Sequence, residues 1–348
     1  MRRVAIACLA TGLLLVSATF AETVEDAAEY IAEGTYAIPI KRNPPKYPPK
    51  ALRVGIEGWV VVNFSVNEDG TTDDIVVVNT SINRFFEKEA SRTVAGWKYK
   101  PATWDGAPVA QANKTASIVF TMTDSSTALT GTFKKNYEAA QAAIESGDFT
   151  TAEKLIKKMD SSKKRLLADV CHLDVLKAAY WRAQGDRVNT LHYLDRALVI
   201  ADVAVENELY VYLLRQAFDE EVFSNSYVTA LKHYKTLKKF DTDIPADDPI
   251  HSKAEEIQTI LAGDSNIVTT GKIAQCADCL PDTLFWDHQL NRPHFSIDQV
   301  DGEIAEVEIL CGFQSVSLLY NPEAVWSVDK NWGQCQIRVF GEEGTMLE

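Results

Sequence analysis

Residues 58–80, GWVVVNFSVNEDGTTDDIVVVNT, decide the fold of the first globular part of the chain. Val60, Val62, Phe64 and Val66 recur at every second position, which is typical of a half-buried β-strand. The NEDG segment that follows has the residue types of a tight turn. The β-branched run after it, IVVVN, predicts a second strand. We therefore expect a β-hairpin here.

The hydrophobic period changes directly after this hairpin. Phe86, Ala90, Val94 and Trp97 lie on one face of a predicted amphipathic helix. A shorter hairpin should turn at the Asp-Gly pair 105–106, and the apolar residues of 115–122 predict a closing strand. The expected order is strand, strand, helix, hairpin and strand, a small α/β module over residues 44–123.

The same residues carry a family resemblance. The motifs, in chain order, are YP at 47–48, GIEGWVVVNF at 55–64, the DG turn at 69–70, WKYKPA at 97–102 and DGAPV at 105–109. Together they resemble the TonB C-terminal domain of Gram-negative energy transducers, over about 80 of the 348 residues. The resemblance implies a periplasmic domain that engages outer-membrane receptors.

Length and composition predict a multidomain α+β protein. A chain of 348 residues exceeds the usual size of one core, and 46% apolar with 24% charged residues is an ordinary globular composition. The formal net charge is -14, whereas residues 41–122 contain 11 Lys/Arg and 8 Asp/Glu, a net of +3. The module is mildly basic and the rest of the chain is acidic, so the sequence shows no cluster of Lys and Arg that could bind phosphates. Nucleic acid is therefore not an expected partner.

The N-terminus has the pattern of a secretory signal. Arg2 and Arg3 precede an uncharged run that ends in Thr-Phe-Ala at 19–21, which predicts a signal peptide over residues 1–21 and a periplasmic protein. The alternative is an uncleaved inner-membrane anchor facing the periplasm, the only case in which we expect membrane association. Residues 22–43 form a lead-in too short to cross the periplasm, and the apolar run lacks the histidine that resembles the transducer's coupling residue.

The middle of the chain, residues 133–262, has helical periodicity with a repeating motif. Two Gly-Asp turns, at 147–148 and 185–186, each follow an Ala-rich helix and precede another helix, and a weaker copy turns near Asn225. This spacing resembles tetratricopeptide (TPR) repeats, whose stacked helix pairs form a concave protein-binding surface. An irregular helical bundle is the alternative interpretation.

Residues 266–348 return to the two-residue period and predict a β domain stapled by disulfides. Cys311 and Cys335 fall on the apolar sides of two predicted strands, so we expect a bridge across a separation of 24 residues, worth roughly 3 kcal/mol. Cys276 and Cys279 are expected to pair with each other, although crossed pairings stay open. Cys171, inside a helix, is expected to be a buried free thiol.

The sequence offers little support for catalysis. The CADC segment at 276–279 lacks the strand and helix that surround a redox CxxC, and its spacing to His288 and His294 fits no common zinc finger. No nucleophile constellation or phosphate loop is present in the sequence. We expect the protein to have no enzymatic activity and to bind neither a cofactor nor a metal.

The binding hypothesis rests on a sheet edge. The outer side of the closing strand would present unpaired N–H and C=O groups, on which an extended peptide can add as a further strand. The expected binding residues are those of the strand and of the YP motif: Tyr47, Pro48, Thr115, Ser117, Val119 and Thr121. The alternative is that another domain or a second copy covers this edge.

These observations predict a non-catalytic periplasmic adapter that binds proteins or peptides, with outer-membrane receptors among the candidates. One alternative is a membrane-anchored transducer for outer-membrane receptor transport. Another is a thiol-disulfide enzyme that uses Cys276 and Cys279.

Overall fold

The computed structural model describes residues 34–81, 86–122, 127–162, 165–275 and 284–348. The signal-peptide expectation and the Cys276–Cys279 pairing concern residues outside these ranges. Within them, no helix combines the length and apolarity needed to cross a membrane.

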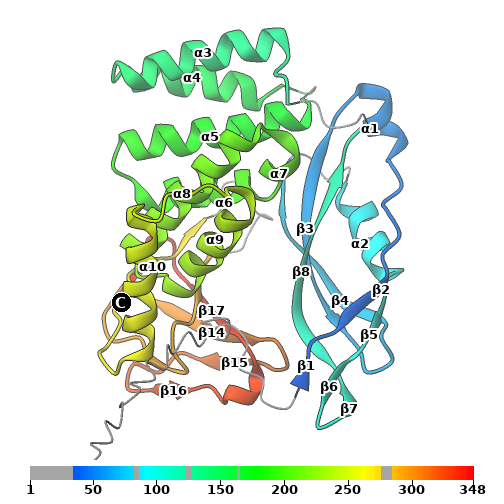
Figure 1. Ribbon diagram of the computed structural model, residues 1–348, viewed down its shortest axis with the longest axis vertical. Coiled ribbons are helices and arrows are strands. Elements are labelled where there is room, and N and C mark those ends of the chain that lie inside the picture. The colour runs from blue at the N-terminus through cyan, green and yellow to red at the C-terminus, as the bar shows by residue number, and fades with distance from the viewer. Residues whose placement is uncertain (1–33, 82–85, 123–126, 163–164, 276–283) are drawn as a thin grey trace, which may run out of the picture. The chain divides into compact units, whose positions relative to one another are not determined.

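The module is built around a three-stranded antiparallel sheet in the order β4-β3-β8 (Figure 1). Its elements are α1 (Pro49–Val54), β3 (Gly58–Val66), β4 (Thr72–Thr80), α2 (Glu87–Ala95), β5 (Lys98–Lys100), β6 (Ala102–Trp104), β7 (Ala107–Val109) and β8 (Gln111–Phe120). The predicted strands, helix and hairpin are present in the expected order, and the structure adds α1 before β3 and β5 after α2.

One face of this sheet carries the core of the module. The alternating residues of β3 pack there with the apolar stripe of α2, and both sets are buried because their periods match their secondary structures. The members that carry this packing are Val60, Val62, Phe64, Phe86, Ala90, Val94 and Trp97.

The residues before the module add to it. β1 (Gly34–Thr35) pairs with β6, and β2 (Ile38–Lys41) pairs with β5, both antiparallel. The sequence predicted only an extended lead-in here. The lead-in instead forms two short strands, which pair with the segment after α2.

The helical region consists of successive packed helix pairs (Figure 1). The helices are α3 (Gly131–Glu145), α4 (Phe149–Asp160), α5 (Leu167–Ala183), α6 (Arg187–Leu198), α7 (Ala201–Ala204), α8 (Asn207–Phe223), α9 (Tyr227–Phe240) and α10 (Pro249–Ala262). The turns of α3/α4, α5/α6 and α8/α9 contain Gly147, Gly185 and Asn225, all with positive φ. The three predicted turns are thus present, and their identity as TPR units stays a prediction.

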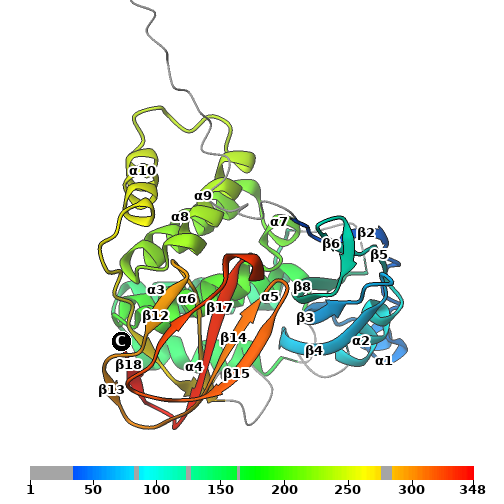
Figure 2. The ribbon, with the colours of Figure 1, turned by 90° about the horizontal axis from the view of Figure 1, so that it is seen from below.

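The β domain at the C-terminus contains a five-stranded sheet in the order β10-β11-β17-β14-β15, most of which is visible in Figure 2. Its strands are β10 (Ala274–Gln275), β11 (Leu284–Gln289), β14 (Ile304–Cys311), β15 (Ser315–Leu319) and β17 (Cys335–Gly341). Five shorter strands and a 3₁₀ turn complete the domain: β9 (Gly271–Lys272), β12 (His294–Ser296), β13 (Val300–Asp301), β16 (Val325–Ser327), β18 (Met346–Leu347) and the turn Lys330–Trp332.

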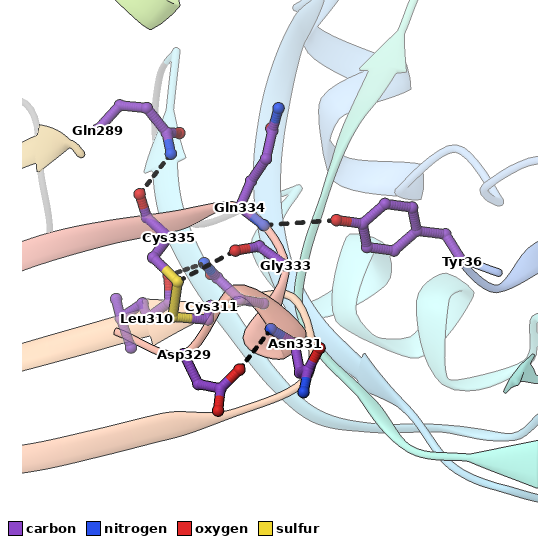
Figure 3. Close-up of a disulfide and its surroundings, with 10 residues drawn as sticks. Tyr36, Gln289, Leu310, Cys311, Asp329, Asn331, Gly333, Gln334 and Cys335 are labelled. Atoms are coloured by element: carbon purple, nitrogen blue, oxygen red, sulfur yellow. Dashed lines mark hydrogen bonds between the residues drawn. A yellow bond between two sulfur atoms is a disulfide. The ribbon is translucent and has the colours of Figure 1, made fainter. Parts of the chain in front are cut away.

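The expected disulfide joins the two central strands of this sheet. Cys311 of β14 and Cys335 of β17 are register partners and are bonded to each other (Figure 3). The backbone N–H of Gln334 also donates to the hydroxyl of Tyr36, at 3.4 Å. The bridge therefore lies close to where the β domain meets the residues that precede β2.

The second face of the module's sheet packs against the helices. Trp59 and Val61 of β3 are buried in the same cluster as residues of α5, α6 and α8. Arg196 of α6 is 3% exposed, and its Nη1 donates to Asn79 Oδ1 at 2.7 Å while its guanidinium lies 5.1 Å from the Trp59 ring. Strand β3 is thus covered on both faces along Trp59–Val61.

Candidate functional site

The outer edge of β8 is defined by the hydrogen bonding of β3. The Trp59 carbonyl accepts from Ser81 N–H at 3.0 Å, on the β4 side. Because neighbouring residues of a strand bond in opposite directions, Val60 and Val62 face β8. Their register partners are Ile118 and Ala116.

It follows that the backbone groups of Thr115, Ser117 and Val119 point away from β3. No strand lies beyond β8 in this sheet, and none of the hydrogen bonds of the described residues occupies these three N–H groups. Thr115 and Ser117 are also exposed to solvent, whereas Val119 is half-buried. The structure therefore places three of the predicted edge residues in a row at an open edge.

Both ends of this edge are covered. At the beginning of β8, Ala112 N–H donates to the Gly312 carbonyl at 2.9 Å, and Asn113 Nδ2 donates to the Leu310 carbonyl at 3.3 Å. Both acceptors belong to the β domain. The start of the edge is thus closed by another part of the chain.

The far end of the edge is occupied by a buried glutamate. Glu57 Oε1 accepts from Thr121 Oγ1 at 3.1 Å and from Met122 N–H at 2.8 Å. Strand β8 ends at Phe120, and the predicted binding residue Thr121 lies just beyond it with its side chain engaged. The open edge is consequently limited to residues 115–119.

A groove of about 430 Å³ runs along this open stretch. One wall is residues 115–119 of β8, and the other comprises Trp97 and the segment Arg42–Pro45. Trp97 Nε1 donates to the Asn43 carbonyl at 3.1 Å, which holds the second wall to the end of α2. The groove has a backbone edge on one side and an aromatic ring with prolines on the other.

The groove carries positive charge at its border. The Arg42 guanidinium lies 4.8 Å from the Trp97 ring and donates to the Tyr99 hydroxyl at 2.9 Å. Burial raises the pKa of Tyr99 against the opposing effect of Arg42. Burial, followed by the charge of Arg42, lowers the pKa of Lys114, whose Nζ donates to the Ala37 carbonyl at 3.3 Å. Two cations therefore lie near the opening, and carboxylates of a ligand would be favoured there.

The YP motif lies elsewhere in the module. Tyr47 packs edge-on against Phe86 and Phe120, and its hydroxyl donates to the Ile56 carbonyl. Burial, followed by the charge of Glu57, raises the pKa of Tyr47 to about 12. Pro48 is the N-cap of α1. Neither residue lines the groove, and their described contacts are structural.

The sequence pattern does not reveal the second wall of the groove. The sequence places Arg42 and Asn43 in the lead-in and Trp97 on the apolar face of the predicted helix. Trp97 is indeed almost fully buried, but it also lines the groove. The run of prolines was the available signal, since prolines keep a segment extended without adding donors.

The described cysteine outside the disulfide, Cys171, is a structural residue. Cys171 is buried and its Sγ contacts the Ala197 carbonyl at 3.6 Å. Burial, followed by the charge of Asp174, raises its pKa far above the usual range of a thiol. A thiol that stays protonated is a poor nucleophile. Its expected state, a buried free thiol, is confirmed.

A second cavity, of about 670 Å³, lies between the end of α10 and the β domain. Trp286 and His288 line it and stack on each other, with ring centroids 5.3 Å apart. Burial lowers the pKa of His288 to about 4, so the imidazole is neutral at physiological pH. His294 also lines the cavity.

Comparison with known proteins gives matches to the module. The family described as Gram-negative bacterial TonB protein C-terminal matches residues 43–122. Protein TonB of Pseudomonas aeruginosa is 40% identical over 73 residues, 21% of this chain and 21% of its own. Protein TonB of Escherichia coli K12 is 32% identical over 87 residues, 25% of this chain and 36% of its own.

A solved structure is similar to about a quarter of the chain. The solution NMR structure of the Pseudomonas aeruginosa TonB C-terminal domain is 32% identical and covers 26% of this chain and 88% of its own, with a TM-score of 0.23. The chain spans about a fifth to a third of the length of the two curated relatives. The similarity thus concerns one domain.

Proposed function

Residues 43–122 are a TonB C-terminal domain, and from this premise we propose that the chain is a periplasmic adapter that captures extended segments of envelope transport proteins. The captured segment lies in the β8 groove and adds to the sheet as a further strand. The helical region supplies a second protein-binding surface. The proposed work is binding, without catalysis.

The observation that carries this proposal is the open stretch 115–119 beside a preformed groove. Three outward N–H groups at alternate positions fit the main chain of one extended peptide. Main-chain pairing tolerates many sequences, and the Trp97 wall and the cations near the opening would select among them. Outer-membrane receptors belong to the expected partners because the resembled domain engages them.

A single substitution separates strand addition from other binding modes. Ser117→Pro removes an outward N–H that the β3–β8 ladder does not use, and proline is accepted on an edge strand when its nitrogen faces outward. The preceding residue, Ala116, is already extended, as proline requires. We expect this variant to fold and to lose its partners.

The matched control is Ser117→Ala, which removes the same hydroxyl and keeps the backbone donor. Partners would be captured from outer-membrane extracts with wild-type and variant proteins, and their amounts compared by quantitative mass spectrometry. Loss of the same partners in Ser117→Pro, with retention in Ser117→Ala, supports the proposal. Equal recovery by all three proteins contradicts strand addition at this edge.

A further inference from the structure

Three side chains that can bind metals meet in the helical region, far from one another in the sequence. Asp195 lies on α6, Glu221 near the end of α8 and His233 on α9. One ligand atom from each lies within 4.8 Å of the others. The three helices are packed side by side, α6 on α8 and α8 on α9, so the cluster belongs to the fold itself.

From this geometry we propose a binding site for a divalent first-row transition metal ion, with zinc as the representative ion. Two carboxylates and one imidazole form a mixed oxygen and nitrogen donor set, and imidazole is a ligand for zinc, iron, copper and nickel. Magnesium and calcium favour sites made of oxygen alone. Three protein ligands leave a fourth position for water or another group.

The distances permit such an ion after a small adjustment. His233 Nδ1 lies 2.8 Å from Glu221 Oε2, a hydrogen-bond distance. Ligand atoms of a tetrahedral zinc ion lie about 3.4 Å apart, because each is about 2.1 Å from the metal. An ion would therefore replace this hydrogen bond and separate the two side chains by a few tenths of an ångström.

Burial differs among the three residues in a way that suits ion entry. Glu221 is 2% exposed and the His233 side chain 19% exposed, whereas Asp195 has an exposed surface, although burial of its carboxyl group raises the pKa to about 7. The Glu221 backbone is also fixed, since its carbonyl accepts from Ser226 N–H at 2.8 Å. Glu221 therefore offers a ligand that is already held in place, and the exposed surface of Asp195 leaves the ion a path from solvent.

Charge supports the same occupant. Two carboxylates at this distance repel each other, and a protonated His233 balances only one of them. A divalent cation with a neutral imidazole balances both. The neighbouring Lys232 acts on Glu221 through its charge, but its Nζ donates to Gln289 Oε1 of β11, at 3.2 Å, and not to either carboxylate.

No local motif in the sequence points to this site. A local metal motif places its ligands a few residues apart, as in CxxC or HExxH. Here the ligands come from three helices, and the only zinc site considered from sequence used the CADC segment. His233 is a lone histidine on a helix, and in this proposal it acts as a metal ligand.

The test uses the full chain without an affinity tag, freed of metal by chelation. Zinc chloride is titrated into wild type, Asp195→Ala and His233→Gln by calorimetry, with Asp202→Ala of α7 as control. Asp195 and Asp202 are both exposed helical residues, so neither change should unfold the protein. We expect one ion per chain in wild type and control, and an affinity lower by about tenfold or more in the two ligand variants.

Cobalt titration identifies the donor atoms. Cobalt at the proposed site should give ligand-field bands in the visible without thiolate charge-transfer absorption, and the bands should be lost in Asp195→Ala. Zinc binding that is equal in all four proteins, zinc binding absent from wild type, or a thiolate charge-transfer band would each overturn the proposal.

Discussion

Removing the Glu57 carboxylate should loosen the module from the helical region. Glu57 is 4% exposed, and besides Thr121 and Met122 it binds Leu167 N–H, the first residue of α5, at 2.8 Å through Oε2. The carboxylate therefore closes the end of β8 and satisfies an otherwise unpaired donor at the start of a helix. A negative charge there also interacts favourably with the helix dipole.

The expected magnitude follows from the three hydrogen bonds. A hydrogen bond to a charged acceptor contributes about 1.5–3 kcal/mol, and donors left buried without an acceptor add a desolvation cost. Since such contributions are not additive, we expect Glu57→Ala to lower the free energy of unfolding by about 3–5 kcal/mol. That loss is a large fraction of the net stability of a domain.

Two measurements check this expectation. Urea unfolding followed by tryptophan fluorescence gives the stability change, and amide hydrogen exchange shows where it arises. The amides of Met122 and Leu167 should lose protection, because both donate to the missing carboxylate. Glu68→Ala, the same change at an exposed glutamate of the same module, is the control. A stability of Glu57→Ala equal to that of Glu68→Ala would refute the reasoning.

Three further predictions concern stability. Replacing both Cys311 and Cys335 with alanine should lower the free energy of unfolding by about 3 kcal/mol, measured in urea, because the bridge closes a 24-residue separation; an unchanged midpoint would contradict this. The pKa of His288 falls from 6.5 to about 4 on folding, so the unfolded chain binds the proton more tightly. The stability that the buried neutral imidazole allows is fully present above about pH 6.5. It is lost as the pH falls towards 4, by up to about 3 kcal/mol, because the unfolded chain gains a proton that the folded chain does not bind. Urea midpoints measured between pH 7.5 and 4.5 should vary less in His288→Gln than in the wild type. If the midpoints of both proteins change equally with pH, His288 is not the cause of the pH dependence. Gly70→Ala should destabilise by about 2 kcal/mol or more, because φ is +78° and the new Cβ would lie 2.0 Å from the Tyr99 carbonyl oxygen; an unaltered thermal midpoint would argue against it.

The sequence predicted the structure best where the spacing of apolar residues matches the repeat of a single helix or strand. The two-residue period of β3 and the helical period of α2 predicted which residues enter the core of the module, and Val60, Val62, Ala90 and Val94 are all fully buried. The Cys311–Cys335 bridge followed from the same reasoning. In each case the residues that touch lie on regular elements, and their side-chain directions follow from the period alone.

The parts that the sequence could not predict depend on contacts between distant segments. Trp59 lies on the face of β3 opposite to the core, and its burial is explained by the helices more than a hundred residues later. In the sequence, Glu57 is only one position of the motif GIEGWVVVNF. In the structure, its carboxylate accepts a hydrogen bond from Leu167 N–H, more than a hundred residues away. The covered start of β8 has the same origin, because Gly312 and Leu310 belong to the β domain.

The open edge of β8 is the central claim, and residue-resolved amide hydrogen exchange of the free chain tests it most directly. Ala116 and Ile118 donate within the sheet, whereas Thr115, Ser117 and Val119 face outward. We predict slow exchange at the first two amides and fast exchange at the other three. Uniform protection of all five amides would show that this edge is already covered, and would contradict the account.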